Sequence, residues 1–349
     1  MGLTALEQPK ALALLHALNA ASQGLTVQSL VAQLKLPPEH VALLVQTLNE
    51  AATQVLGRTL IVSSSSELTS AATILSTAQW GKLDLLNTVS LWQQLHGRGR
   101  LSVLAVTDST NSLLERCLHN CVSGDAVVSE LQTAARGRRG NRWQLGMATQ
   151  LSLSLVWKFN TTQETWGLPL LVALAVVEAL SPLKLPLQIK WPNDLYLHDS
   201  KLCGILVELH NPPLKQDGGV WAVIGIGLNV YADAALATRL AKRQIAALGH
   251  LGSLALDRTT IAARIINALR HKLQDFACQG FGPFVSQWEQ YDYLRGRQVV
   301  LELDDGHQLT AVAVGTDKSG RLLLDTAMGR QAFASGHIVK VGRQGALMP

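Results

Sequence analysis

Apolar residues in the first 62 positions follow helical spacing three times and then form a short extended run. The helical spacing predicts helices over residues 9–19, 27–34 and 39–52, and Thr26 is placed to cap the second of them. Residues 60–62, Leu-Ile-Val, have the composition of a short β-strand. Helix, helix, turn, helix and strand form the outline of a winged helix-turn-helix module.

The middle of the chain has the pattern of a sheet with helices packed around it. Residues 68–99 are expected to be mostly helical, and a further helix starts at about Ser112. Apolar runs and alternation predict strands at 101–106, 151–159, 187–190, 201–208 and 221–230. The strongly apolar segment 168–180 reads as a buried helix, and 257–279 reads as an amphipathic one. This alternation favours a mixed sheet with flanking helices.

The pattern changes again after Gly296, where short apolar runs recur at the spacing of a small β-barrel. The strands predicted there are 298–306, 308–315, 321–325 and 338–341. We therefore expect an α+β protein of three domains: a winged-helix-like domain over 1–70, a central domain over 71–292 and a small β domain over 293–349.

Composition is consistent with a buried core and sets limits on the class of protein. Of the 349 residues, 48% are hydrophobic and only 16% are charged. The segment 168–180 is too short to span a membrane and contains Glu178. Four cysteines are too few for a disulfide scaffold of this size, and they lack the spacing of a zinc site. We expect a cytoplasmic protein with no membrane association and with reduced, structural cysteines.

The net charge of +5 is modest, and the N-terminal region does not share it. Up to residue 70 the chain has three basic and four acidic residues: Lys10, Lys35, Arg58, Glu7, Glu39, Glu50 and Glu67. The third predicted helix and the expected wing at 62–67 contain no lysine or arginine. Because DNA-binding proteins first need basic residues that contact phosphates, this pattern argues against DNA binding. It favours a vestigial or protein-docking domain on a DNA-binding fold.

Positive charge gathers instead in the segment 132–140, Gln-Thr-Ala-Ala-Arg-Gly-Arg-Arg-Gly, between two predicted strands. Arg136, Arg138 and Arg139 stand there among glycines, and Trp143 follows. Guanidinium groups offer paired donors to phosphate or carboxylate, and glycine lets a backbone fold closely around a ligand. The segment predicts a loop that closes over an anionic small molecule. A solvated basic turn and a nucleic-acid patch are the alternatives that the loop by itself leaves open.

Polar residues crowd the start of the helix that follows the strand 101–106. The run Asp108-Ser-Thr-Asn111 stands there, and Ser112 with Glu115 matches a capping box. Ordinary helix capping explains these residues. The alternative is that free N–H groups and hydroxyls at this helix start hold a polar group of a ligand.

Two more places indicate a ligand near the central sheet. Lys190 ends a predicted strand directly before a Trp-Pro-Asn-Asp corner, which is an unusual position for a merely solvated charge. Gly225 and Gly227 lie on the same face of a predicted strand, so another group is expected to pass close to the backbone there.

Five segments, in this order, resemble the biotin–protein ligase family. They are Asp108-Ser-Thr-Asn111, the loop 132–140 with Trp143, Lys190-Trp-Pro-Asn-Asp-Leu195, Lys201-Leu-x-Gly-Ile-Leu-Val-Glu208 and Gly225-Ile-Gly-Leu-Asn229. Together they cover about residues 101–230. The chain resembles the three-domain form of the family, which has an N-terminal winged helix, a central mixed-sheet ligase domain that binds biotin and ATP, and a C-terminal SH3-like β-barrel.

The resemblance implies a two-step reaction. Biotin and Mg-ATP first give biotinyl-adenylate and pyrophosphate, and a lysine of a carrier domain then takes the biotin and releases AMP. By the same resemblance, the catalytic residues are Lys190, Arg136 and Arg138. The residues implied for biotin are Ser109, Thr110, Asn111, Gln132, Arg136, Gly137, Arg138, Lys190 and Gly204. The residues implied for ATP and the adenylate are Arg138, Arg139, Trp143, Lys190, Asn193 and Asn229. No dedicated metal site is implied, since Mg²⁺ arrives with ATP.

The sequence departs from the family pattern at the loop. Ala135 stands where the family usually has glycine, which matters only if that position needs a positive φ. Asn141 replaces a frequent arginine, although Arg142 follows, and residues 144–147 lack the usual Ser-Pro-x-Gly. These changes bear on how the loop orders over an adenylate.

The sequence leaves three alternatives to this function. A lipoate or octanoate ligase or transferase shares the fold neighbourhood, but the Arg-Gly-Arg loop and the Lys-Trp-Pro-Asn-Asp segment favour biotin. A DNA-binding regulator that senses biotin or its adenylate, acting as a repressor, is compatible with ligase activity, and an inactive paralogue is the remaining alternative. The expected partner is the biotin carboxyl carrier domain of acetyl-CoA carboxylase. The exposed strands also allow two copies to pair through the central sheet.

Overall fold

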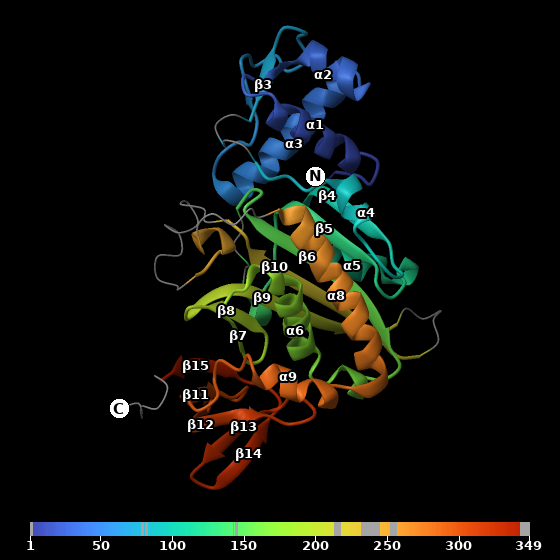
Figure 1. Ribbon diagram of the computed structural model, residues 1–349. Helices are drawn as coiled ribbons and strands as arrows, with labels where there is room; N and C mark the ends of the chain where they lie inside the picture. Colours follow the sequence, from blue (N-terminus) through green and yellow to red (C-terminus); the bar gives the residue numbers. More distant parts are fainter. Residues whose placement is uncertain are drawn as a thin grey trace.

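Three units follow one another along the chain and along the long axis of the molecule (Figure 1). This computed structural model describes residues 3–77, 80, 83–141, 143, 146–212, 218–231, 245–251 and 257–342. The N-terminal unit lies at one end, the central sheet and its helices lie in the middle, and the C-terminal sheet lies at the other end. Arg142, Gln144 and Leu145, three of the positions around which the loop departs from the family pattern, fall outside the described residues.

The N-terminal unit packs three helices against a small sheet. Its elements are α1 (Gln8–Ala20), β1 (Leu25–Thr26), α2 (Val27–Leu34), α3 (Pro38–Leu56), β2 (Val62–Ser63) and β3 (Ile74–Ser76). The sheet is antiparallel, in the order β1-β3-β2. The three helices were predicted, and Thr26 caps α2 as expected, because its side chain accepts a hydrogen bond from the Ser29 N–H at 3.2 Å.

Two predictions about this part of the chain were wrong. Residues 68–99 are not mostly helical: they hold β3 and only one described α-helix, α4 (Thr88–Gln93). The third strand completes the small sheet, so tertiary pairing overrides local helix propensity. The strand expected over 60–62 begins later, at Val62, because the N–H groups of Leu60 and Ile61 donate to Oδ1 of Asn49 on α3 instead.

The central unit contains a mixed sheet, as the sequence predicted; the sheet has seven strands, and the one at Asp194–Leu197 was not predicted. Its strands are β4 (Leu101–Thr107), β5 (Ala126–Gln132), β6 (Gln150–Phe159), β7 (Leu187–Lys190), β8 (Asp194–Leu197), β9 (Ser200–His210) and β10 (Val220–Asn229). The order is β4-β5-β6-β10-β9-β8-β7, with β4 and β5 parallel and the other neighbours antiparallel. Its α-helices are α5 (Thr110–Cys117), α6 (Leu168–Leu180), α8 (Arg258–Gln279) and α9 (Val285–Glu289). Short 3₁₀ turns lie at Leu118–Asn120, Arg138–Gly140, Gln163–Thr165, Ser181–Leu183, Leu248–Leu251 and Gly282–Phe284.

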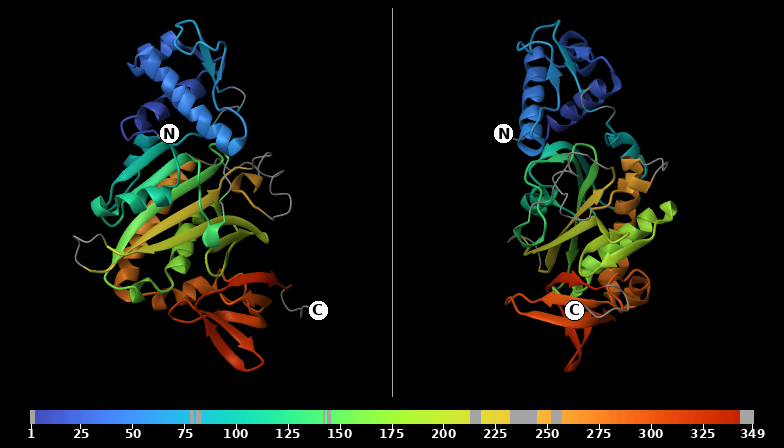
Figure 2. Two further views of the ribbon diagram at one scale, coloured as in Figure 1. Left: turned by 180° about the vertical axis from the view of Figure 1, so that it is seen from behind. Right: turned by 90° about the vertical axis from the view of Figure 1, so that its left-hand side faces the viewer.

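Helices cover the two faces of this sheet unequally. Helices α6 and α8 lie side by side over one face, in front of the strands in Figure 1, and the strands lie in front of them when the molecule is turned around (Figure 2). Leu151, Leu153 and Leu155 of β6 belong to the core on that face. On the opposite face, Leu114 of α5 packs on Val156 and its neighbours in a smaller cluster. The rest of that opposite face is available for a site.

Helix α6 is the apolar helix expected over 168–180, and 11 of its 13 residues are buried. The surrounding segment Gln163–Leu183 is long and apolar enough to cross a membrane on length and composition alone. However, α6 packs against α8 and β9. Burial in the core therefore accounts for its apolar composition.

Helix α1 fastens the N-terminal unit to the central sheet. The Gln8 side chain, 5% exposed, donates to the Val106 carbonyl at 2.6 Å and accepts from the Ala105 N–H at 2.8 Å. These groups lie on β4, which is an edge strand of the sheet formed by the described residues. Asn19 forms a matching pair of hydrogen bonds with the backbone of Leu83. The Gln8 amide thus bonds to backbone groups of the edge strand, and both amides fix helix α1 to the central unit.

The C-terminal unit is an antiparallel five-stranded sheet in the order β14-β13-β12-β11-β15. The strands are β11 (Gln298–Glu302), β12 (Gln308–Thr316), β13 (Leu322–Thr326), β14 (Gly329–Phe333) and β15 (His337–Val341). The sequence predicted four of them and missed β14. That strand, Gly-Arg-Gln-Ala-Phe, shows no apolar alternation because it is an edge strand with both faces largely exposed.

Candidate functional site

Strand register lines up a row of residues across five strands of the central sheet. Lys190 on β7 pairs with Asp194 on β8, which pairs with Gly204 on β9. Gly204 pairs with Gly227 on β10, which pairs with Ser152 on β6. Two candidate residues, Lys190 and Gly204, thus lie in one row although 14 positions separate them in the chain. The row runs toward the middle of the sheet face that α6 and α8 leave free.

Gly204 and Gly227 form a flat patch in this row, called the glycine floor below. The Trp143 indole rests on it, since a Cβ on Gly204 would lie 2.8 Å from Trp143 and one on Gly227 would lie 2.6 Å from it. A Cβ on Gly225 would lie 2.4 Å from Oδ1 of Asn111. The expectation that another group passes close to Gly225 and Gly227 is confirmed, and the close groups are these two side chains. Glycine is required because any side chain there would collide with them.

At one side of the floor the start of α5 meets β5 and β6, a cluster called the helix end below. Oε1 of Gln132 accepts from the Thr110 N–H at 2.7 Å and from the Thr110 hydroxyl at 3.2 Å. The Ser154 hydroxyl reaches Oγ1 of Thr110 at 2.6 Å and Oδ1 of Asn111 at 2.5 Å. All four side chains belong to residues that are at most 6% exposed. The structure therefore brings together three predicted residues and orients them through Ser154.

Ser109, also predicted, is the N-cap of α5, and its hydroxyl accepts from the Ser112 N–H at 3.4 Å. The predicted capping box at Ser112 and Glu115 is wrong, because the helix begins earlier, at Thr110. Ordinary capping and a polar site therefore occur together here: Ser109 caps, while Thr110 and Asn111 face the sheet.

Glu208 on β9 joins the helix end to the basic loop. Its Oε2 accepts from Nδ2 of Asn111 at 2.8 Å and from Nη2 of Arg136 at 2.9 Å. Arg136 also lies 3.5 Å from Oε2 of Glu115. The first loop arginine is therefore held by carboxylates, and an anionic ligand that binds it must compete with them.

Arg138 is less exposed than the other two loop arginines, Arg136 and Arg139. Its Nη1 donates to Oδ1 of Asn193 at 2.9 Å, and Nδ2 of Asn193 donates to the Ile205 carbonyl at 2.6 Å. Burial lowers the pKa of Arg138 from its ordinary value. The structure thus brings two predicted residues together, with the charge of Arg138 paired to a neutral amide and kept available for an anion.

Lys190 stands at the end of the row, half-buried, with its Nζ 5.4 Å from the centre of the Tyr196 ring. Burial lowers the pKa of Lys190, and the charge of Asp194 opposes this shift. Asp194 itself pairs with Lys201 at 2.8 Å. Among the described residues, no hydrogen bond is formed by Nζ of Lys190. A desolvated ammonium group without a bound carboxylate is suited to an anionic ligand.

Arg139 differs from the other two loop arginines. Its Nη2 donates to Asp304 at 3.2 Å, and its Nη1 lies 3.7 Å from Glu302, both in the C-terminal unit. The structure therefore pairs Arg139 with carboxylates of the C-terminal unit, so that it links the loop to the C-terminal sheet.

The departure at Ala135 is settled by the backbone. The positive-φ residues other than glycine in the described chain include Arg139 but not Ala135. The alanine is therefore compatible with the loop, and its carbonyl accepts from the Trp143 N–H at 3.1 Å. Gly137 has extended φ and ψ of −118° and −178°, and its N–H donates to the Asn141 carbonyl at 2.7 Å.

At the other side of the floor lies a pair of amides, called the amide end below. Asn229 on β10, 4% exposed, donates through Nδ2 to the Ala246 carbonyl at 3.0 Å. Its Oδ1 accepts from Nε2 of Gln150 at 2.8 Å. Gln150 and Asn229 are register partners, as are Ser154 and Gly225 at the helix end. The two ends are four residues apart along β6, roughly 13 Å at the rise of a β-strand.

Two family models match the chain. Residues 103–229 match the biotin/lipoate A/B protein ligase family, and residues 295–341 match the biotin protein ligase C-terminal domain. The bifunctional ligase/repressor BirA of Escherichia coli K12 is 37% identical over 249 residues, which cover 70% of this chain and 74% of that protein. The chain belongs to the biotin protein ligase family. The biotin–[acetyl-CoA-carboxylase] ligase of Mycobacterium tuberculosis is 32% identical and is covered over 95% of its length.

A solved biotin protein ligase has the same fold. The Aquifex aeolicus enzyme, in a complex with biotin and ATP, superposes with a TM-score of 0.58 at 27% identity. The match covers 70% of this chain and 99% of that chain. Both substrates of a biotin protein ligase are anions, and Arg138 and Lys190 supply cations beside the floor on which the Trp143 indole rests.

Three residues of this ligase site were not assigned from the sequence: Ser154, Glu208 and Gln150. Glu208 ends the segment 201–208 that resembles the family, but the resemblance implied no role for it. Ser154 belongs to the run Leu-Ser-Leu-Ser-Leu, where serines alternating with leucines ordinarily face solvent. No signal in the sequence marked Ser154, because only the strand register places it beside Gly225. Gln150 gave no signal, since its importance depends on the register with Asn229.

Proposed function

We propose that this biotin protein ligase assembles biotinyl-adenylate across the glycine floor, with biotin at the helix end and the nucleotide at the amide end. A carboxylate oxygen of biotin attacks the α-phosphorus of ATP, and the bond from that phosphorus to the bridging oxygen breaks. Pyrophosphate leaves with Mg²⁺, which enters on ATP. The amine of a carrier lysine then attacks the acyl carbon, and AMP leaves as a proton is lost.

The observation that carries this proposal is the position of Lys190 at the end of the row that contains the floor. The reaction brings a carboxylate and a triphosphate together and concentrates negative charge at the α-phosphate. A fixed, desolvated ammonium group stabilises that charge more than it stabilises the separate substrates. Arg138, bound to a neutral amide, adds a second cation without first having to leave a carboxylate.

The helix end suits the ureido ring of biotin. That ring offers a carbonyl acceptor and two N–H donors, and the helix end offers hydroxyls and amides already oriented by one another. The loop residues Arg136 and Gly137 lie above this region, since Arg136 reaches Glu208. We propose that the loop closes over the adenylate, because a mixed anhydride hydrolyses when water reaches it.

Biotin-dependent exchange of labelled pyrophosphate into ATP tests the first step directly. The proposed site predicts exchange that requires biotin and Mg²⁺ and that lipoate does not support. Exchange with lipoate but not with biotin would contradict the assignment of biotin as the substrate, while the adenylation reaction itself would stand.

The proposed partner is the biotin carboxyl carrier domain of acetyl-CoA carboxylase. The name of the Mycobacterium tuberculosis relative, and that of a Paracoccus denitrificans relative at 29% identity, specifies that carboxylase. Pairing of two copies through the central sheet stays a prediction that sedimentation equilibrium with and without biotin and ATP can test. A cytoplasmic location stays a prediction as well.

We further propose that the N-terminal unit is a winged helix-turn-helix and the C-terminal sheet an SH3-like barrel, with domain limits near residues 70 and 292. The element order α1, α2, α3, β2, β3 supports the first assignment. The relatives named ligase/repressor suggest DNA binding, but α3 carries no lysine or arginine. We therefore expect only weak, non-specific DNA binding, which a titration at several salt concentrations measures.

A further inference from the structure

The orientation of the Gln150 amide is fixed by its surroundings. Nδ2 of Asn229 donates to the Ala246 carbonyl at 3.0 Å and lies 3.5 Å from the Lys201 carbonyl. Carbonyls accept only, so this atom must be the nitrogen, and the other atom of the Asn229 amide must be the oxygen. That oxygen accepts from Gln150 at 2.8 Å, so the interacting atom of Gln150 is Nε2. Oε1 of Gln150 therefore points away from Asn229.

This oxygen has no hydrogen-bond partner within the described part of the chain, although Gln150 is only 3% exposed. Two neighbouring groups share this condition: the hydroxyl of Thr149 and the indole Nε1 of Trp143. A buried acceptor without a donor costs free energy on the order of 1–3 kcal/mol. Such groups are rare in folded proteins, and the two at the floor and its amide end, on Trp143 and Gln150, indicate that a ligand completes them.

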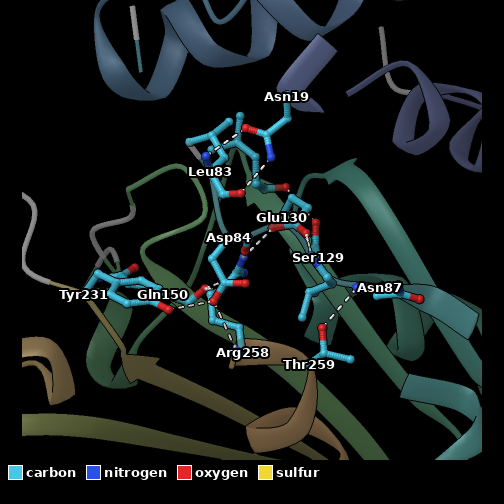
Figure 3. Close-up of polar contacts among 12 residues, drawn as sticks. Asn19, Leu83, Asp84, Asn87, Ser129, Glu130, Gln150, Tyr231, Arg258 and Thr259 are labelled. Carbon is cyan, nitrogen blue, oxygen red and sulfur yellow. Dashed lines mark hydrogen bonds and ion pairs between the residues drawn. The ribbon is translucent and has the colours of Figure 1, made fainter. Parts of the chain in front are cut away.

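Gln150 cannot easily move to find a donor, because its backbone is fixed. Its carbonyl accepts from Nε and Nη2 of Arg258 at 3.1 and 2.7 Å. Arg258 is wholly buried and forms an ion pair with Glu130 at 2.8 Å, and its backbone N–H donates to Asp84 at 3.2 Å. Figure 3 shows Arg258 among Gln150, Asp84 and Glu130, with Tyr231 also bonded to Asp84. The network joins β6, α8 and the segment that leads in from the N-terminal unit.

The free oxygen lies at the end of the site opposite the helix end. Register places Gln150 and Asn229 two residues beyond the Ser152–Gly227 pair, on the same sheet face. The distance along the strand from the floor is roughly 7 Å. A ligand that has one end at Thr110 and Asn111 and crosses the floor reaches the amide end with its other end.

We propose that Oε1 of Gln150 accepts a hydrogen bond from the 6-amino group of adenine and so makes the enzyme specific for ATP. This inference rests on the proposed function, which places the nucleotide at the amide end. The 6-amino group is the only N–H donor on an adenine base, and the ring nitrogens beside it are acceptors. Guanine has an oxygen at the same position, and two acceptors facing each other repel.

Purine riboside 5′-triphosphate, which lacks only the 6-amino group, tests the inference on the unaltered protein. We expect its kcat/KM in biotin-dependent pyrophosphate exchange to be about 30-fold below that of ATP, and that of GTP to be lower still. Titration calorimetry with the same three nucleotides measures binding separately from the reaction. 3′-Deoxy-ATP controls for a ribose hydroxyl as the donor and should be exchanged within about threefold of ATP.

Gln150→Met keeps the length of the side chain and removes both polar atoms. We expect the variant to lose about 30-fold in kcat/KM with ATP but to treat ATP and purine riboside triphosphate alike, within about threefold. Gln274→Leu, at an exposed position on α8, is the matched control and should keep the full preference for ATP.

The outcomes separate the inference from the reaction. A preference for ATP in calorimetry without any exchange would contradict the proposed function and support base recognition by Gln150. Equal treatment of ATP and purine riboside triphosphate by the unaltered protein in both measurements would overturn the inference whatever the exchange rate. If Gln150→Met kept the full preference for ATP over purine riboside triphosphate, another residue would recognise the amino group. This result would also overturn the inference.

Discussion

The two ends of the glycine floor differ in whether their side-chain oxygens have a hydrogen-bond donor nearby. At the helix end, Oε1 of Gln132 accepts from the Thr110 N–H, and the side-chain oxygens of Thr110 and Asn111 both lie within hydrogen-bond distance of the Ser154 hydroxyl. At the amide end, Oε1 of Gln150 accepts none. Both ends are buried in the same sheet face, so the difference lies in chemistry and not in depth.

This difference indicates two ways of preparing a site for a ligand. The helix end is oriented before the ligand arrives, which lowers the entropy lost on binding. The amide end keeps an unmet acceptor, so binding of the correct group removes a cost that the folded protein carries. We expect changes at the helix end to act on biotin, changes at the amide end to act on the nucleotide, and Lys190 to affect both.

The largest effect is expected for Lys190→Ala. The variant should lose at least about 1,000-fold in pyrophosphate exchange, because the nearby Lys201 is already paired with Asp194 and cannot replace the missing ammonium group. Its melting temperature should stay within about 3 °C of the unaltered protein, since Nζ makes no hydrogen bond among the described residues. Lys318→Ala, at an exposed position, is the control. Normal exchange by Lys190→Ala would contradict the proposal that Lys190 stabilises the charge at the α-phosphate.

The pH dependence of exchange should report the same lysine. Burial lowers the pKa of Lys190 below its ordinary value of 10.5, so the ammonium loses its proton at lower pH than an exposed lysine does. The required form is the charged one, so the rate should fall as the pH rises through the lowered pKa, by about tenfold per pH unit. Lys190→Arg should be slower but should lack this alkaline decline. The same decline in both proteins would assign it to another group.

A smaller effect, confined to one substrate, is expected for Ser154→Ala. Removing this hydroxyl takes away the group that lies within hydrogen-bond distance of the oxygens of both Thr110 and Asn111. We expect the KM for biotin to rise about 10-fold while the KM for ATP changes less than about twofold. Ser102→Ala, on the exposed side of β4, controls for loss of a hydroxyl from the sheet. Equal changes in both KM values would show that the two ends are not independent.

The smallest effect is expected where the loop meets the C-terminal unit. Asp304→Asn weakens the contact with Arg139, but Asp304 is 68% exposed and Arg139 is 39% exposed. Exposed ion pairs contribute little, so release of the adenylate should change by no more than about threefold, with less effect at high salt. Stopped-flow fluorescence of Trp143 and the other tryptophans measures this rate. A large acceleration would make the C-terminal sheet part of the loop closure.

Much of the fold followed from the sequence because its signals are local. The helices of the N-terminal unit, the buried helix α6 and the long strands β6, β9 and β10 each have their own periodicity. The error over residues 68–99 arose where pairing with distant strands decides the structure: β3 is only three residues long and pairs with β1 and β2. No local pattern contains that information.

The site shows the same limit at the level of single residues. Lys190, Arg138 and Asn111 stand in segments whose order could be matched to a family, and the structure places them on one sheet face. The matched set also included Arg139, which turns instead toward Asp304, because the direction of a side chain in a 3₁₀ turn cannot be read from order along the chain. Gln150 and Ser154 depend on strand register, which the sequence did not reveal.

The central claim is that this site joins biotin, and not a related acid, to a protein lysine through an adenylate. The most direct test is intact mass spectrometry of a biotin carboxyl carrier domain incubated with the protein, Mg-ATP and equal concentrations of biotin and lipoate. The account predicts one added mass, that of biotin less water, on a single lysine. A lipoyl increment would contradict the substrate assignment. No increment, with Lys190 and Arg138 intact, would contradict the proposed catalysis itself.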